Sequence, residues 1–230
     1  MKTLIFFLIL FFGSIPSYSQ IADTMPTFIY GEQELDSFMQ DNIVLPMDLS
    51  GLQYEIEMSF DVDTSGTVKN AKIEDYQLSG VSIAEKKSDF VKGMQMMLNR
   101  EAMRVIYFSS GLWIPVIQEN TKVAGRRKIK VKFDTNQFGK NNISTFKVRN
   151  HEDPSRYYNN GVKKLQQKKP ILAVKYLEES IRLKEDVDSY FNLGIAYMKI
   201  QNSLLACKNW EKAQKMGDTE VQSLISKYCK

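Results

Sequence analysis

The sequence predicts an α+β fold, in which a small antiparallel three-stranded sheet packs on helices and is followed by an all-α domain of helical hairpins. Three observations lead to this prediction. Residues 53–62 alternate apolar and polar side chains, as a half-buried strand does. Residues 89–108 carry apolar side chains at spacings of three and four, which is typical of a helix with one buried face. The last third of the chain contains an internal repeat.

Length and charge narrow the class of protein. The chain has 230 residues and a formal net charge of +4, and its length suits two small domains. We assign residues 20–134 to a first domain, 135–153 to a linker, and 154–230 to helical repeats with a capping helix. Without a leader whose only charge is Lys2, the net charge is 30 − 27 = +3. This charge is too small to indicate binding to nucleic acid or to an anionic membrane surface.

Residues 1–19 have the parts of a secretory signal peptide. Lys2 precedes the apolar run 4–12, and Ser17 and Ser19 are the small residues before a cleavage point that we place after Ser19. The run is shorter than the ~20 residues that a membrane-spanning helix needs, and no cysteine lies nearby to carry a lipid. We therefore expect an exported protein of the periplasm or cell envelope. An uncleaved signal that anchors the chain is the alternative.

The strand at 53–62 is expected to be the first strand of a β-hairpin. One face of this hairpin is apolar, so another element must pack on it and exclude water. Its second strand is expected at 67–75 after the turn 63–66, with a polar loop at 77–88 and a shorter helix at 32–42. The helix at 89–108 is the expected cover, through the apolar stripe Phe90, Met94, Met97, Leu98, Ala102, Val105 and Ile106.

A third strand is expected at 126–133, after the Trp113–Pro115 segment and a polar loop. Lysines and apolar residues alternate in it, and lysines commonly protect the edge of a sheet. If this strand lies beside the first, its basic residues face acidic ones across the ladder. The facing side chains would be Lys128, Lys130 and Lys132 on one strand and Glu55, Glu57 and Asp61 on the other.

Residues 25–133 resemble the carboxy-terminal domain of the TonB energy-transducer family, in the single-domain version common in Bacteroidetes-type bacteria. The order and spacing of several landmarks carry this resemblance: Pro26 with Gly31, Pro46, the turn Asp63–Gly66 with Val68, and Trp113 with Pro115.

The resemblance implies that the domain recognises the TonB box, a short extended peptide of an outer-membrane receptor, which adds as a strand to the sheet edge. By position, the implied peptide-binding edge consists of Arg127, Lys128, Ile129, Lys130, Val131, Lys132 and Phe133. A transducer of this family also has a transmembrane anchor and a proline-rich spacer, which we do not find in this sequence.

The second domain contains two copies of a helical pattern. Gly161, Ala173, Leu177 and Ser180 recur as Gly194, Ala206, Trp210 and Ala213, in each case 33 residues later (for example 194 − 161 = 33). This pattern resembles the tetratricopeptide repeat, in which small residues let paired helices approach. The first copy has Lys164 where an aromatic residue is usual. Residues 220–229 are expected to form a capping helix.

The two cysteines are expected to form a disulfide bond. An exported protein with an even number of cysteines favours pairing. If the last repeat helix and the capping helix form an antiparallel hairpin that turns at Gly217–Asp218, Cys207 and Cys229 meet at its far ends. Two buried thiols that never meet are the alternative.

No catalytic or metal-binding pattern stands out in the sequence. His151 is the one histidine, it falls in the linker, and neither a zinc spacing nor a glycine-rich phosphate loop is present. Asp61, Asp63 and Ser65 fit the start of a calcium loop, but position twelve is Lys72 instead of glutamate. We therefore expect no enzymatic activity, no metal and no cofactor.

The leading hypothesis is an envelope adaptor that binds protein partners, which include TonB-box peptides, and that contacts the membrane only through those partners. The alternative is a component of TonB-dependent transport that an uncleaved signal holds in the membrane. The helical domain is expected to bind proteins, or else only to shield the first domain or to form a homodimer.

Overall fold

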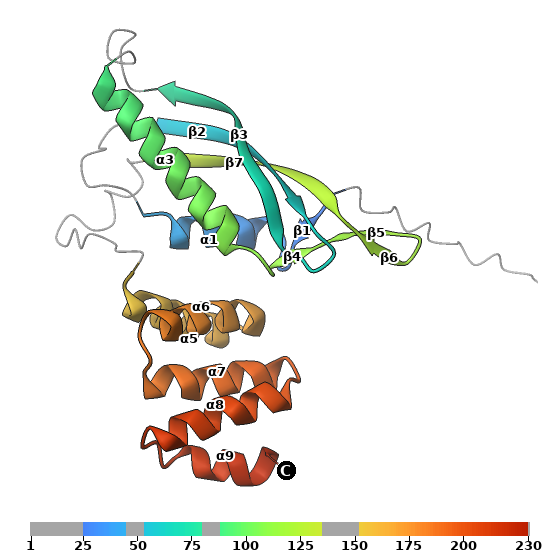
Figure 1. The fold of residues 1–230 in the computed structure, drawn as a ribbon, viewed down its shortest axis with the longest axis vertical. Coiled ribbons are helices and arrows are strands. Elements are labelled where there is room, and N and C mark those ends of the chain that lie inside the picture. Colours follow the sequence, from blue (N-terminus) through green and yellow to red (C-terminus); the bar gives the residue numbers. More distant parts are fainter. Residues whose placement is uncertain (1–24, 45–52, 80–87, 135–151, 230) are drawn as a thin grey trace, which may run out of the picture.

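The computed structural model describes residues 25–44, 53–79, 88–134 and 152–229. It has a mixed α+β architecture, as predicted. A small antiparallel sheet with covering helices forms one part, and the C-terminal helices stack away from it in the other (Figure 1).

The main sheet has the strand order β3-β2-β7, with both pairings antiparallel. β2 (Gln53–Val62) lies between β3 (Val68–Ser79) and β7 (Gly125–Asp134). The predicted hairpin is confirmed, and the third strand lies beside the first. β3 is longer than predicted, so the start of the loop expected at 77–88 belongs to the strand. The reason is that Leu78 faces inward and is buried in the core.

Two short strand pairs flank this sheet. β1 (Thr27–Phe28) pairs with β4 (Trp113–Ile114), and β5 (Val116–Gln118) pairs with β6 (Thr121–Val123). The β5–β6 hairpin replaces the polar loop that the sequence suggested. Its two turn residues both have positive φ, as a tight two-residue hairpin requires.

The turn between β2 and β3 depends on Gly66 and Asp63. Gly66 has φ +84, and a Cβ there would lie 2.4 Å from the carbonyl oxygen of Trp113. The Asp63 carboxylate accepts a hydrogen bond from the backbone N–H of Ser65 at 2.9 Å and lies 2.8 Å from Lys69 Nζ. The Lys69 contact and the Ser65 hydrogen bonds hold the pKa of Asp63 below its ordinary value. This carboxylate closes the turn.

Two helices cover the inner face of the sheet: α1 (Glu32–Asn42) and α3 (Asp89–Phe108). Alternate residues of β2, and residues three or four apart on each helix, are apolar and lie on the side that faces the other elements. These apolar sides pack together as one core. This core includes Leu35, Phe38, Tyr54, Ile56, Met58, Phe60, Val91, Met94, Leu98, Ala102, Val105 and Ile106.

The predicted apolar stripe of α3 is wrong at two positions. Phe90 is 70% exposed and Met97 is 49% exposed. The buried stripe runs through Val91 and Leu98, their immediate neighbours, and consecutive residues point about 100° apart around a helix. Spacings of three and four alone do not distinguish the centre of such a stripe from its margin.

Five helices form the C-terminal part, which we call the helical module. They stack in chain order, with the first pair beside α1 and the last helix farthest from the sheet (Figure 1). The second hairpin starts 33 residues after the first (187 − 154 and 203 − 170). The helices are α5 (Pro154–Gln166), α6 (Pro170–Leu183), α7 (Val187–Lys199), α8 (Ser203–Lys215) and α9 (Val221–Tyr228).

Close approach at a glycine joins the helices of each hairpin. A Cβ on Gly161 would lie 2.6 Å from the Leu177 side chain, and a Cβ on Gly194 would lie 2.3 Å from the indole nitrogen of Trp210. Both pairs occupy equivalent positions of the repeat. The predicted close approach of paired helices at small residues is therefore present in both copies.

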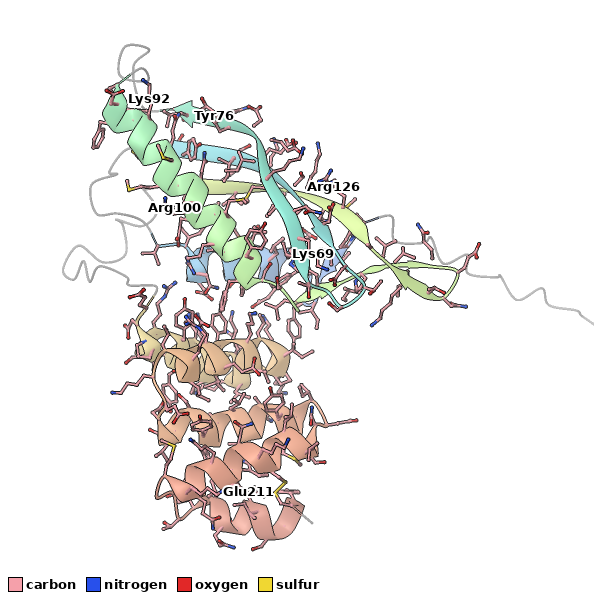
Figure 2. The ribbon with its side chains drawn as sticks, viewed as in Figure 1. Lys69, Tyr76, Lys92, Arg100, Arg126 and Glu211 are labelled. Atoms are coloured by element: carbon pink, nitrogen blue, oxygen red, sulfur yellow. A yellow bond between two sulfur atoms is a disulfide. The ribbon has the colours of Figure 1, made fainter. Side chains whose placement is uncertain are left out.

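The last helix closes the stack. Val221 of α9 is buried, and Leu224 and Ile225 pack against the core of the helical module. The Sγ atoms of Cys207 on α8 and Cys229 after α9 lie 2.01 Å apart, a disulfide distance, as expected for the predicted hairpin (yellow bond in Figure 2).

Replacing both Cys207 and Cys229 by serine should lower the stability of the helical module by about 3 kcal/mol, because a disulfide that spans 22 residues restricts the unfolded chain. Urea unfolding followed by circular dichroism measures this change. A reductant should destabilise the wild-type protein and leave the double variant unchanged. Equal midpoints for the oxidised wild type and the variant would contradict the prediction.

Candidate functional site

The open edge of the main sheet is the first candidate site. Within the described residues, β7 pairs with β2 on one side and with no strand on the other. Its ten residues pair with β2 without a register shift, whereas β3, at the opposite edge, has two irregularities. Alternate residues of an antiparallel strand direct their backbone N–H and C=O groups away from the paired neighbour. β7 is therefore the regular edge on which another strand could add, and it contains all of the predicted residues 127–133.

The outer face of β7 is basic and lies against the acidic face of β2, as predicted. Lysine Nζ atoms lie 3.4–3.5 Å from carboxylate oxygens of β2, and the Arg126 guanidinium lies 3.1 Å from Asp61 (Arg126 is labelled in Figure 2). These solvent-exposed pairs contribute little stability each. The lysine pairs are Lys128–Glu57, Lys130–Glu55 and Lys132–Glu55.

The inner face of β7 belongs to the core. Ile129, Val131 and Phe133 are buried beside the inward row of β2. Arg127 also points inward, and its guanidinium donates to Glu32 on α1 at 2.6 Å. Of the predicted edge residues, then, the three lysines face solvent, three side chains support the core, and Arg127 ties the strand to α1.

A buried charge cluster between α1 and the helical module is the second notable site. Lys164 of α5 is 1% exposed, and its Nζ lies 2.7 Å from Glu34 and 3.3 Å from Asp41, both on α1. Lys169 contacts the other carboxylate oxygen of Glu34. A buried ammonium group needs such partners, because the loss of water would otherwise cost several kcal/mol.

Polar and aromatic contacts surround this cluster. Asn42 donates to the Tyr176 hydroxyl at 2.7 Å, and Arg156 donates to the backbone carbonyl of Asp41. Side chains fill the space between α1 and the α5–α6 pair (Figure 2). The core of the sheet domain extends across this interface through an aromatic group formed by Phe38, Phe108, Tyr157 and Tyr176.

The cluster shifts the pKa of Glu34. Burial of the carboxyl acts to raise its pKa, but hydrogen bonds from Lys164 and Lys169 outweigh burial, so the pKa lies below the ordinary value of 4.5. The carboxylate is charged at neutral pH, which keeps both lysines paired. This arrangement serves packing between two parts of the chain.

One departure from the repeat pattern in the sequence coincides with this cluster. Lys164 occupies the repeat position of Tyr197 in the second copy (197 − 164 = 33). Tyr197 donates a hydrogen bond to Glu178 between the hairpins, whereas Lys164 reaches the carboxylates of α1. The departure from the repeat pattern marks the residue that docks the helical module.

Within the described ranges, no cluster of three or more histidine, cysteine or acidic residues could hold a metal ion. None of the described helices is long and apolar enough to cross a membrane. The expected signal peptide at 1–19 and His151 lie outside the described residues.

Comparison with known proteins found no matching family model, no similar curated protein and no similar solved structure.

Lys164→Met should lower the free energy of unfolding by about 3–5 kcal/mol, because the buried Glu34 carboxylate then keeps only the Lys169 contact and Asp41 loses its nearer lysine. The matched control is Lys163→Met, since the Lys163 side chain is 52% exposed and lies 4.0 Å from Asp41. The control should lose less than about 1 kcal/mol. Urea unfolding monitored by tryptophan fluorescence compares them, and equal losses would argue against the buried cluster.

Glu34→Gln should destabilise the protein in a pH-dependent way. The folded-state pKa of Glu34 is lowered, so its contribution is full above the ordinary value of 4.5 and is lost as the pH falls through the lower folded value. The difference in unfolding free energy from wild type should therefore shrink on acidification. Glu211→Gln, on the exposed surface of α8 (labelled in Figure 2), is the control and should change little. A difference that is independent of pH would contradict this assignment.

Proposed function

We propose that this chain is an exported adaptor of the cell envelope, whose sheet domain is of the TonB C-terminal type and binds extended peptides as an added strand on β7. One observation carries the proposal: β7 is the terminal strand of the sheet within the described residues, and its pairing is regular over its whole length. Main-chain hydrogen bonds supply the affinity in this mode of recognition.

Several landmarks of the TonB-like pattern support this domain type because, in the described part of the chain, they lie close together; Pro46 is outside the described residues. The Gly66 turn packs on the carbonyl of Trp113, and β4, which begins at Trp113, pairs with β1 next to Pro26. Trp113 also packs edge-on against Phe60 of the central strand at 4.9 Å between ring centroids. The separate sequence landmarks thus build one corner of the sheet domain.

The helical module, in this proposal, is of the tetratricopeptide type and holds a second protein-binding surface at a fixed position. The equal spacing of its two hairpins and their equivalent glycine contacts support this type. The buried cluster at Lys164 supports a fixed orientation, since undocking would leave charges without partners.

The same β7 edge supports a second candidate function, a component of TonB-dependent transport that an uncleaved signal retains in the membrane. Membrane fractionation of the full-length protein distinguishes the two candidates. Recovery of a processed chain in the periplasmic fraction favours the adaptor, and recovery of the unprocessed chain in the inner membrane favours the transport component.

Titration of the ¹⁵N-labelled mature chain with receptor-derived TonB-box peptides should shift the backbone amide signals of residues 125–134 and leave those of α9 unchanged. The physical reason is that new hydrogen bonds form only along the open edge. Two control peptides carry backbone N-methyl groups, one on the odd-numbered residues and the other on the even-numbered residues. The peptide whose N-methyl groups block the donors facing β7 should not bind. Unchanged β7 signals at saturating peptide would refute the proposal.

A further inference from the structure

The charges on the sheet suggest which peptides the β7 edge prefers. We infer that it selects extended peptides in which acidic residues alternate with apolar residues, with the acidic side chains on the solvent-facing side of the sheet. The inference rests on the proposed function, because it concerns a strand bound at the same edge. It adds the chemistry of the ligand.

Charge changes sign from β2 to β7 on the outer face. β2 presents Glu55, Glu57 and Asp61, and the residues opposite them in register are Lys132, Lys130 and Arg126. A strand added beyond β7 would place its outward side chains opposite this basic row, at about 4.5–5.5 Å between Cβ atoms. Opposite charges stabilise such pairs and like charges destabilise them, so the next strand should be acidic.

The basic row on the outer face of β7 consists of Arg126, Lys128, Lys130 and Lys132, and the carboxylates of β2 do not neutralise it fully. Glu55 is shared, because Lys130 and Lys132 both lie 3.4 Å from its carboxylate oxygens. Four basic side chains of β7 thus meet three carboxylates of β2, the fourth pair being Lys128 with Glu57, and Lys128 also interacts electrostatically with Glu74 of β3. The Lys130 and Lys132 side chains are 60% and 75% exposed, whereas Glu55 is 27% exposed. The lysines therefore remain accessible to an acidic partner from the open side.

The inner face requires the alternating residues to be apolar. Ile129, Val131 and Phe133 form a buried row that continues the row of β2. Inward side chains of an added strand would lie beside this row, where apolar residues pack favourably and unpaired polar groups are costly. Together the two faces specify a period of two, with acid outside and apolar inside.

The opposite edge lacks this pattern. β3 carries both basic and acidic residues. In the register with β2, Lys69 lies opposite Asp61, Lys72 opposite Ser59 and Asp75 opposite Glu57. It also has two register irregularities, which locally disrupt a ladder. Acidic selectivity is therefore expected at β7 alone among the described edges of the main sheet.

Fluorescence anisotropy with three short labelled peptides tests the inference. The peptides alternate valine with glutamate, glutamine or lysine, and are matched in length. At low salt the glutamate peptide should bind most tightly and the lysine peptide least, with about a twofold to fivefold change for each lysine faced. Added salt should reduce the differences. Equal affinities for the three peptides would overturn this inference but leave edge binding intact.

A charge-removal variant provides the matched comparison. The triple substitution Lys128→Gln, Lys130→Gln and Lys132→Gln should remove the preference for the glutamate peptide over the glutamine peptide. The control Lys199→Gln, Lys208→Gln and Lys215→Gln makes the same charge change at exposed positions of the helical module and should keep the preference. Loss of the preference in both variants would indicate net charge instead of the β7 row and would overturn the inference. If neither these peptides nor TonB-box peptides shift the β7 amides, the proposed function fails as well.

Discussion

The position of the helical module on the sheet domain depends on one buried ammonium group. Lys164 has almost no contact with water, and its charge is compensated only when α5 lies against the Glu34 and Asp41 carboxylates of α1. In a partly separated interface the Lys164 ammonium would be neither fully hydrated nor paired with the carboxylates. The fully docked and the fully separated states are therefore both favoured over intermediate ones. The aromatic group around Tyr176 then extends the core of the sheet domain into the helical module. The interface between the two parts therefore contains both a buried ion cluster and a continuous apolar core.

α1 connects the open sheet edge with this interface. Glu32, the first residue of α1, forms an ion pair with Arg127 of β7. Glu34, two residues later, forms an ion pair with Lys164 of α5. The same helix packs its apolar side chains beneath the sheet. Neighbouring acidic residues on one short helix therefore position both the strand that we propose as a binding edge and the module beside it. Any partner that engages both surfaces would meet them at a set separation.

Patterns with a strong period made the sheet and the helical repeat predictable. Alternation at 53–62 placed β2, and alternating lysines placed β7, whose basic face complements the acidic face of β2 now that the two strands are seen to be neighbours. Periodicity could not centre the stripe of α3, where Phe90 and Met97 are exposed. The short β5–β6 hairpin has too few residues to show alternation. The docking cluster was missed because Lys164 lies 130 residues from Glu34 in the sequence, and nothing local in α1 indicates that its acidic residues will face another part of the chain.

The stack of helices is closed at both ends by different means. At one end Lys164 fixes α5 to α1, and at the other the Cys207–Cys229 bond fixes α9 over Trp210. Growth at either end would break a specialised contact. In arrays of this kind each unit contacts only its neighbours, so the place to lengthen the array is its middle. Insertion of a duplicated hairpin between Leu183 and Val187 would lengthen the helical module and leave the contacts at both of its ends unchanged. The architecture thus allows its reach to be changed by engineering without redesigning either end.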